Sequence, residues 1–181
     1  MGERFYAETF TPEVRAAQRH YNGRDHQPGA PEREALGPAE MEWIARRDHF
    51  YMATVNSAGW PYVQHRGGPP GFLRALDPHT LAFADFKGNK QLISTGNLVS
   101  GGKVALLLMD YVQRERLKIL GTARVSDVRA LPYALEGIAA PELVKRTERL
   151  IVIDVVAFDW NCPAYITPRY TEAEFKAAGG G

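Results

Sequence analysis

The chain has 181 residues, a length that suits one domain with a proper core and leaves little room for a second. Hydrophobic residues make up 45% of it and charged residues 24%, which is the composition of a folded globular protein rather than a disordered one. The formal net charge of +1 gives no electrostatic case for binding nucleic acid or an acidic membrane surface.

Cysteine use and hydropathy indicate a cytoplasmic protein. Cys162 is the single cysteine, which excludes an internal disulfide framework and fits a reducing compartment. The first residues lack the basic-then-apolar pattern of a signal peptide. The longest apolar run, residues 104–109, is far too short to span a bilayer. We therefore expect a cytoplasmic protein that acts on neither membranes nor nucleic acid.

The first 40 residues are predicted to form an N-terminal helical extension. Thr11–Glu13 supplies an N-cap, a first-turn proline and a favourable acidic residue, so a helix is expected through about Arg19. Residues 21–38 mix Asn, Gly, Asp, Pro and Arg, which indicates a surface loop. Gly37-Pro38 then opens a second predicted helix.

From Phe50 onward the pattern changes to short strands separated by turns. Residues 50–55 and 61–65 read as the two strands of a hairpin, with turn residues between them. Residues 73–76 are expected to continue this hairpin beyond a Gly/Pro bulge. Residues 80–86 then form the next predicted strand.

The second half of the chain continues this alternation of strands and helices. Residues 92–99 are predicted to be helical, and 104–109, apolar on both faces, to form a central strand. Residues 117–125 alternate as a half-buried strand, 131–138 follow helical spacing, and 150–158 form a last strand. Closely spaced antiparallel strands with few helices favour a small β-barrel over a doubly wound sheet.

The segment Lys87–Lys90 is a candidate phosphate site. Lys87 and Lys90 supply positive charge, Gly88 permits close approach to the backbone, and Asn89 offers a hydrogen-bond donor. A helix beginning near Gly88 would add the partial positive charge of its unpaired N–H groups. Arg66, at the end of an earlier strand, would add a bidentate contact. The alternative is that both lysines are solvated and Asn89 is a turn former.

Other candidate sites are weaker. The glycine-rich run Gly67–Gly71 would let a flat ring lie against the backbone, or is a bulge at the rim of the barrel. The five histidines are scattered without metal-ligand spacing, so no metal site is expected. No nucleophile elbow, Walker loop or dinucleotide fingerprint is present, and the catalytic residues are unknown. Cys162 reads as a packing thiol rather than a nucleophile.

Taken together, these motifs resemble the FMN-binding split barrel of the pyridoxamine 5'-phosphate oxidase-like family. The matching features are the hairpin 50–66, the strand 81–85, the loop 87–90, Gly96-Asn97 ahead of 104–107, the strand 117–123 and the tail Asn161-Cys162-Pro163-x-x-Ile166-x-x-Arg169. The resemblance implies a mainly β fold with α, a six-stranded antiparallel split barrel with flanking helices. The barrel domain would span 41–170, between the extension 1–40 and a flexible C-terminal tail, 171–181.

The resemblance also implies FMN as the cofactor and assigns its contacts. The positions that it assigns within one chain are Arg66, Gly67, Gly68, Ala84, Asp85, Lys87, Asn89 and Lys90. The first three would meet the ribityl and ring portion, Ala84 and Asp85 would line the ring and chain, and Asn89 and Lys90 would hold the phosphate. Lys87 follows more loosely.

Family members are homodimers with the cofactor at the subunit interface, so the resemblance implies that a partner chain completes the site. The partner would contribute residues near Gln113 and Arg116, together with Trp160. Two departures argue against vitamin B6 oxidation. Gly67–Pro70 replaces an apolar pair and a lysine of the oxidase, and no Arg-x-His pair follows Trp160.

The expected function is that of an FMN-dependent oxidoreductase, which passes hydride or electrons between FMN and a small-molecule substrate or electron donor. A non-catalytic flavin carrier or sensor would use the same binding residues. A deazaflavin (F420) enzyme would need more Lys and Arg around Lys87 for its longer anionic tail. A haem-binding member of the fold would need His65 or His49 as an axial ligand.

Overall fold

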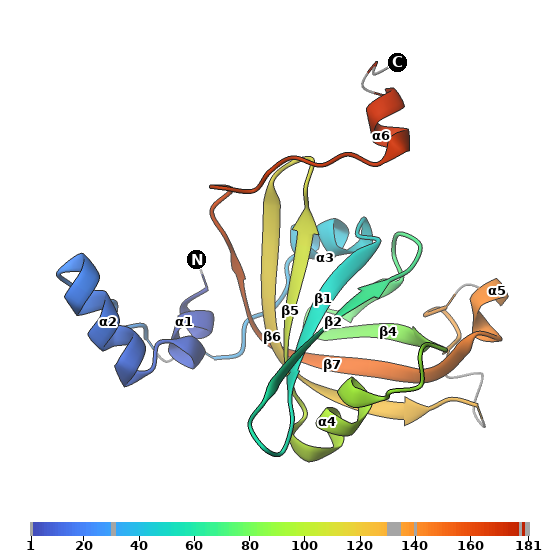
Figure 1. Ribbon diagram of the computed structural model, residues 1–181, viewed down its shortest axis with the longest axis horizontal. Helices are drawn as coiled ribbons and strands as arrows, with labels where there is room; N and C mark the ends of the chain where they lie inside the picture. Colours follow the sequence, from blue (N-terminus) through green and yellow to red (C-terminus); the bar gives the residue numbers. More distant parts are fainter. Residues whose placement is uncertain (1, 30–31, 130–134, 140, 178, 180–181) are drawn as a thin grey trace.

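The computed structural model describes residues 2–29, 32–129, 135–139, 141–177 and 179. Figure 1 shows a curved sheet at the centre, with the N-terminal helices α1 and α2 to one side of it. The elements in chain order are α1 (Glu3–Thr9), α2 (Pro12–Asn22), α3 (Pro38–Ala45), β1 (His49–Val55), β2 (Pro61–Gly67), β3 (Leu73–Asp77), β4 (Thr80–Phe86), α4 (Ile93–Gly101), β5 (Lys103–Asp110), β6 (Glu115–Asp127), α5 (Pro141–Val144), β7 (Thr147–Trp160) and α6 (Glu172–Ala177).

All the described strands belong to one antiparallel sheet in the order β2-β1-β5-β6-β7-β4-β3. The predicted mainly β class with flanking helices is confirmed, but the expected count of six strands is wrong, because the sheet has seven. The additional strand is β3. It does not continue the β1–β2 hairpin and instead pairs with β4 at the opposite edge. The chain reverses at Gly71, which adopts φ +82°, a conformation that glycine reaches without strain.

The sheet rolls up so that strands distant in its order face one another. Phe50 of β1 and Phe83 of β4 pack edge to face with ring centroids 5.2 Å apart. Both side chains are almost fully buried, and Phe72 packs between the same elements. The inner face of β1 is apolar at Phe50 and Met52, but their partners on β2 are Arg66 and Gln64. The sequence therefore places polar groups inside the rim of an apolar barrel.

The N-terminal helices form largely as their capping residues predict. Thr11 Oγ1 accepts a hydrogen bond from the Val14 N–H at 3.3 Å, and α2 continues to Asn22 before Gly23 ends it with φ 72°. Glu40 Oε2 accepts from the Gly37 N–H at 3.0 Å at the start of α3. Helix α1 was not predicted, since Phe5 is its single buried residue and gives no periodicity.

The helices predicted for the second half of the chain hold in part. The helix predicted for 92–99 is confirmed, because α4 spans Ile93–Gly101, but it does not begin near Gly88 as the phosphate hypothesis considered. Of the helix predicted for 131–138, residues 131–134 lie outside the described residues, and residues 135–138 form turns. Within the predicted tail 171–181, residues Glu172–Ala177 form helix α6, positions 178, 180 and 181 lie outside the described residues, and the flexibility of the tail stays a prediction. Among the described helices, none is long and apolar enough to cross a lipid bilayer.

A buried hydrogen bond fastens α4 to the barrel and gives a first prediction. Asn97 Nδ2 donates to Thr54 Oγ1 at 2.9 Å, and the two residues are 8% and 1% exposed. Asn97→Ala leaves the threonine hydroxyl buried without its partner, so we expect unfolding free energy to fall by about 1–3 kcal/mol. Urea unfolding measures this. Val99→Ala on the exposed face of α4 is the control, and equal midpoints for the two variants would contradict the expectation.

Candidate cofactor site

A polar pocket lies where β2, β4, β7 and the start of α4 meet. It holds about 350 Å³ of empty space, part of which is open to solvent. Its lining comprises Gln64, Arg66, Asp85, Phe86, Gly88, Asn89, Lys90, Leu92, Ile93, Ser94, Thr95, Glu148 and Arg149. Four of the residues predicted for the cofactor, Arg66, Asp85, Asn89 and Lys90, therefore meet in one place, although 24 residues separate the first from the last in sequence.

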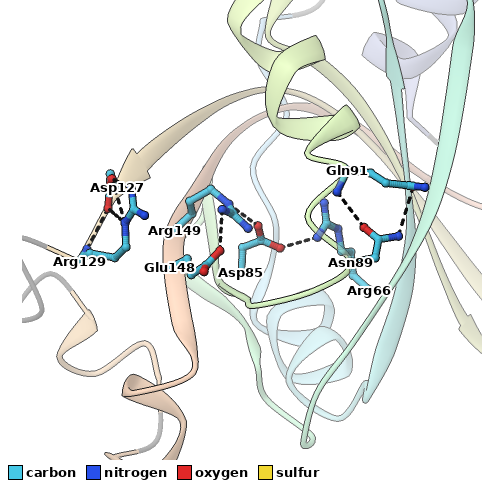
Figure 2. A network of polar contacts seen from close by, with 8 residues as sticks. All are labelled: Arg66, Asp85, Asn89, Gln91, Asp127, Arg129, Glu148 and Arg149. Carbon is cyan, nitrogen blue, oxygen red and sulfur yellow. Dashed lines mark hydrogen bonds and ion pairs between the residues drawn. The ribbon is translucent and has the colours of Figure 1, made fainter.

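The centre of the pocket is a buried carboxylate held by two arginines (Figure 2). Asp85, whose side chain is 5% exposed, accepts from Arg66 Nη1 through Oδ1 and from Arg149 Nε through Oδ2, the latter at 2.8 Å. Arg149 Nη1 also donates to Glu148 Oε2 at 3.0 Å. Asp85 and Arg149 are direct partners across β4 and β7, so the register of the sheet creates this pair.

Arg66 has one donor that no described residue uses. Its Nε is buried and lacks a hydrogen-bond partner. Its guanidinium carbon lies 5.9 Å from the centroid of the Phe83 ring. Burial lowers the pKa of Arg66 from its ordinary value, and the nearby Asp85 carboxylate opposes that change, so the guanidinium stays charged at neutral pH. A buried donor without a partner is costly, and an acceptor on a ligand would satisfy it.

The loop between β4 and α4 presents free backbone N–H groups. Within the described residues, the N–H groups of Gly88, Asn89 and Lys90 donate no hydrogen bond. Lys90 and Leu92 adopt φ values of 63° and 55°, a region that non-glycine residues enter at a cost. Asn89 stabilises the turn, because its Oδ1 accepts from the Gln91 N–H at 3.1 Å. The backbone is therefore held in a shape that exposes donors.

The first turn of α4 adds to these donors. The first intrahelical hydrogen bond runs from the Gly96 N–H to the Leu92 oxygen at 2.9 Å, so the N–H groups of the preceding three residues have no partner inside the helix. They carry the partial positive charge of a helix N-terminus. Ser94, by contrast, is already engaged, since its hydroxyl donates to Gln64 Oε1 at 3.0 Å. Together with the Lys90 ammonium group, this region suits an anion.

Comparison with known proteins identifies the family. A family model described as pyridoxamine 5'-phosphate oxidase matches residues 36–156, more than half of the chain. The chain belongs to the pyridoxamine 5'-phosphate oxidase family. Among curated proteins, no sequence matches it.

Two solved structures share the fold of this chain. A candidate pyridoxamine 5'-phosphate oxidase from Lactobacillus delbrueckii is 24% identical, with a TM-score of 0.52 over 69% of this chain and 93% of that one. A tagged HupZ variant from Group A Streptococcus is 15% identical, with a TM-score of 0.53 over 70% of this chain and 99% of that one. At sequence identities this low, the similarity concerns the fold alone, and it confirms the predicted split-barrel fold.

Some residues assigned from the pyridoxamine 5'-phosphate oxidase family lie outside the pocket lining. Lys87 is exposed, and its N–H donates to the Arg146 oxygen at 2.8 Å. Ala84 is buried in the apolar cluster that includes Leu150 and Val152. A Cβ on Gly68 would lie 2.6 Å from Phe72 Cγ, so this glycine is required by internal packing. The cofactor assignments of these residues, and of Gly67, stay predictions.

The residues assigned to a partner chain are also absent from the pocket lining of their own chain. The Gln113 N–H donates to Asp110 Oδ1 at 2.8 Å at the β5–β6 turn, close in sequence to Arg116 on β6. Trp160 Nε1 donates to Glu40 Oε1 at 3.0 Å, and its ring packs edge to face against Trp43 at 4.9 Å. Their contribution across an interface stays a prediction.

Sequence reasoning missed several pocket residues. Arg149, Glu148, Gln64 and Ser94 line the pocket but belong to no recognised motif. The signal for Arg149 is its register with Asp85, which follows from strand pairing and is not readable from either segment alone.

Proposed function

We propose that the chain is an FMN-binding flavoprotein, an oxidoreductase that passes hydride or electrons between FMN and a small organic substrate or electron donor. The observation that carries the proposal is the buried, unpartnered Nε of Arg66, a residue that lines the same pocket as Gly88, Asn89 and Lys90, whose N–H groups donate no hydrogen bond within the described part of the chain. Membership of the pyridoxamine 5'-phosphate oxidase family supports FMN as the ligand that these donors serve.

The residues present fit a phosphate monoester attached to a polar chain. Asn89 and Lys90 would hold the phosphate through backbone N–H groups and the ammonium group, which forms no ion pair among the described residues. Arg66 would donate its spare Nε–H to the ribityl or phosphate portion. The isoalloxazine ring supplies the hydride chemistry when FMN is bound. The role of this chain is to bind and orient FMN, and the cations Arg66 and Lys90 favour its anionic forms.

The proposal includes a homodimer, because one face of the barrel is apolar and only partly covered by the described residues. The outer sides of β1, β2, β5 and β6 form a groove. We name its core the outer apolar face, defined as Tyr51, Ala53, Val63, Ala105, Leu107 and Leu120. Strand register brings these side chains side by side, as in the pairs Ala53–Val63 and Ala53–Ala105. Contiguous exposed apolar surface of this kind is typical of a protein–protein interface.

The test begins with the chromophore that copurifies, identified by spectrum and by mass after heat release. Flavin-free protein is then titrated with FMN, and binding is followed by quenching of flavin fluorescence. Steady-state oxidation of NADPH or reduction of a dye by the loaded protein measures turnover. Binding with turnover supports the oxidoreductase, and binding without turnover for any donor supports a carrier or sensor. Protein that is colourless and does not bind added FMN would contradict the proposal.

A further inference from the structure

We propose that Arg149 is a positioning residue of the FMN site. It neutralises the buried Asp85, so that Arg66 keeps a net positive charge available for the anionic part of the ligand. This inference rests on the proposed function, because it concerns how the same pocket attracts FMN. It assigns a role to a residue outside every motif considered above.

The two arginines bind the Asp85 carboxylate at separate positions. Arg66 Nη1 and Arg149 Nε bond different oxygens of Asp85, so neither displaces the other. Figure 2 shows the carboxylate between the two guanidinium groups, with Arg66 on the side of the Asn89 loop. The arginines come from β2, an edge strand of the sheet, and from β7, which pairs with β4. Arg149 therefore contacts Asp85 from the side opposite to the Asn89 loop.

Counting the buried charges shows why the second arginine matters. The side chains of Asp85, Arg66 and Arg149 are 5%, 13% and 15% exposed, so their charges are poorly screened by water. Two cations on one carboxylate leave a net charge of about +1 beside the loop. With Arg149 removed, Arg66 and Asp85 would form a neutral pair, and the carboxylate would repel a phosphate. Arg149 therefore makes the electrostatic potential beside the loop more positive.

The other acidic residues near Arg149 do not cancel the positive charge that it adds beside the loop. Glu148 accepts from Arg149 Nη1 at 3.0 Å, but its side chain is 27% exposed and water screens its charge more. Asp127 is the partner of Arg149 across β6 and β7, yet its carboxylate is taken by Arg129, whose Nε lies 3.0 Å from Oδ1. Asp127 is thereby occupied by a different arginine, which leaves Asp85 as the buried partner of Arg149.

The experiment compares FMN with riboflavin, which lacks the phosphate. Dissociation constants for both are measured by flavin fluorescence quenching. For Arg149→Met we expect FMN affinity to fall about fivefold while riboflavin affinity changes less than about twofold. Arg149→Met combined with Asp85→Asn removes one charge of each sign and should restore FMN affinity to within about twofold of wild type. A merely structural role would not produce this rescue.

Controls make each outcome decisive. Arg124→Met removes an arginine paired with Asp154 at 2.6 Å on a side chain that is 60% exposed, and it should leave both affinities unchanged. Wild-type protein that binds no FMN overturns the proposed function and, with it, this inference. Wild-type binding that Arg149→Met leaves unchanged overturns the inference alone. If Arg149→Met does not fold, the double variant decides, since a folded double variant with weak FMN binding also overturns it.

Discussion

Lys90→Ala is expected to weaken FMN binding more than tenfold, corresponding to a loss of about 1.5–3 kcal/mol. The reason is that the Lys90 ammonium group is available to a ligand. Its side chain lines the pocket, is exposed, and forms no ion pair among the described residues. Lys90, with φ 63°, lies in a turn whose backbone N–H groups donate to no acceptor among the described residues. A doubly negative phosphate would therefore meet charge and donors together.

Titration of flavin-free protein with FMN, followed by fluorescence quenching, measures this loss. Lys87→Ala is the comparison, because Lys87 lies in the same loop but outside the pocket lining. We expect it to change FMN affinity less than about twofold, as for a screened surface charge. Equal affinity of wild type and Lys90→Ala would remove the phosphate assignment. An equal loss in both variants would instead indicate a diffuse attraction by the whole loop.

The sequence predicts those parts of this fold that depend on local chemistry. Thr11 and Pro12 predict the start of α2, and the turn residues at 56–59 predict the first hairpin. Both predictions succeed because helix capping and turn formation depend only on residues that are neighbours in sequence. The cation-bearing loop after β4 is equally local. Lys90 and Asn89 could accordingly be assigned to the pocket from their own segment.

Features set by long-range pairing were beyond sequence reasoning. Residues 73–76 were predicted to continue the first hairpin, yet β3 lies at the far edge of the sheet and pairs with β4. A helix beginning near Gly88 was considered for the phosphate site, but Lys90 and Leu92 adopt left-handed conformations before α4 begins at Ile93, and their side chain types do not predict this. Assigning Arg149 to the pocket would have required knowing that β7 pairs with β4. Pairing between distant strands decides which charged side chains share a pocket.

Val63→Lys is expected to convert the proposed dimer to monomers and to lower FMN affinity with it. Val63 is 60% exposed and lies on the outer apolar face, so a lysine there should leave the folded chain intact. In a twofold dimer the same substitution enters the interface twice, and burying two ammonium groups against apolar side chains costs several kcal/mol. We expect the dimer dissociation constant to rise at least about a hundredfold.

Analytical ultracentrifugation of wild type and variant, with and without FMN, checks both parts of this expectation. FMN affinity should fall because the proposed site needs residues of a second chain near Gln113, Arg116 and Trp160, which a monomer cannot bring to its own pocket lining. Val99→Lys, at a position 85% exposed on α4 and outside the pocket, is the matched control and should remain dimeric. Monomeric wild type that still binds FMN would show that one chain suffices for binding. A Val63→Lys variant that stays dimeric would place the interface on another face of the barrel.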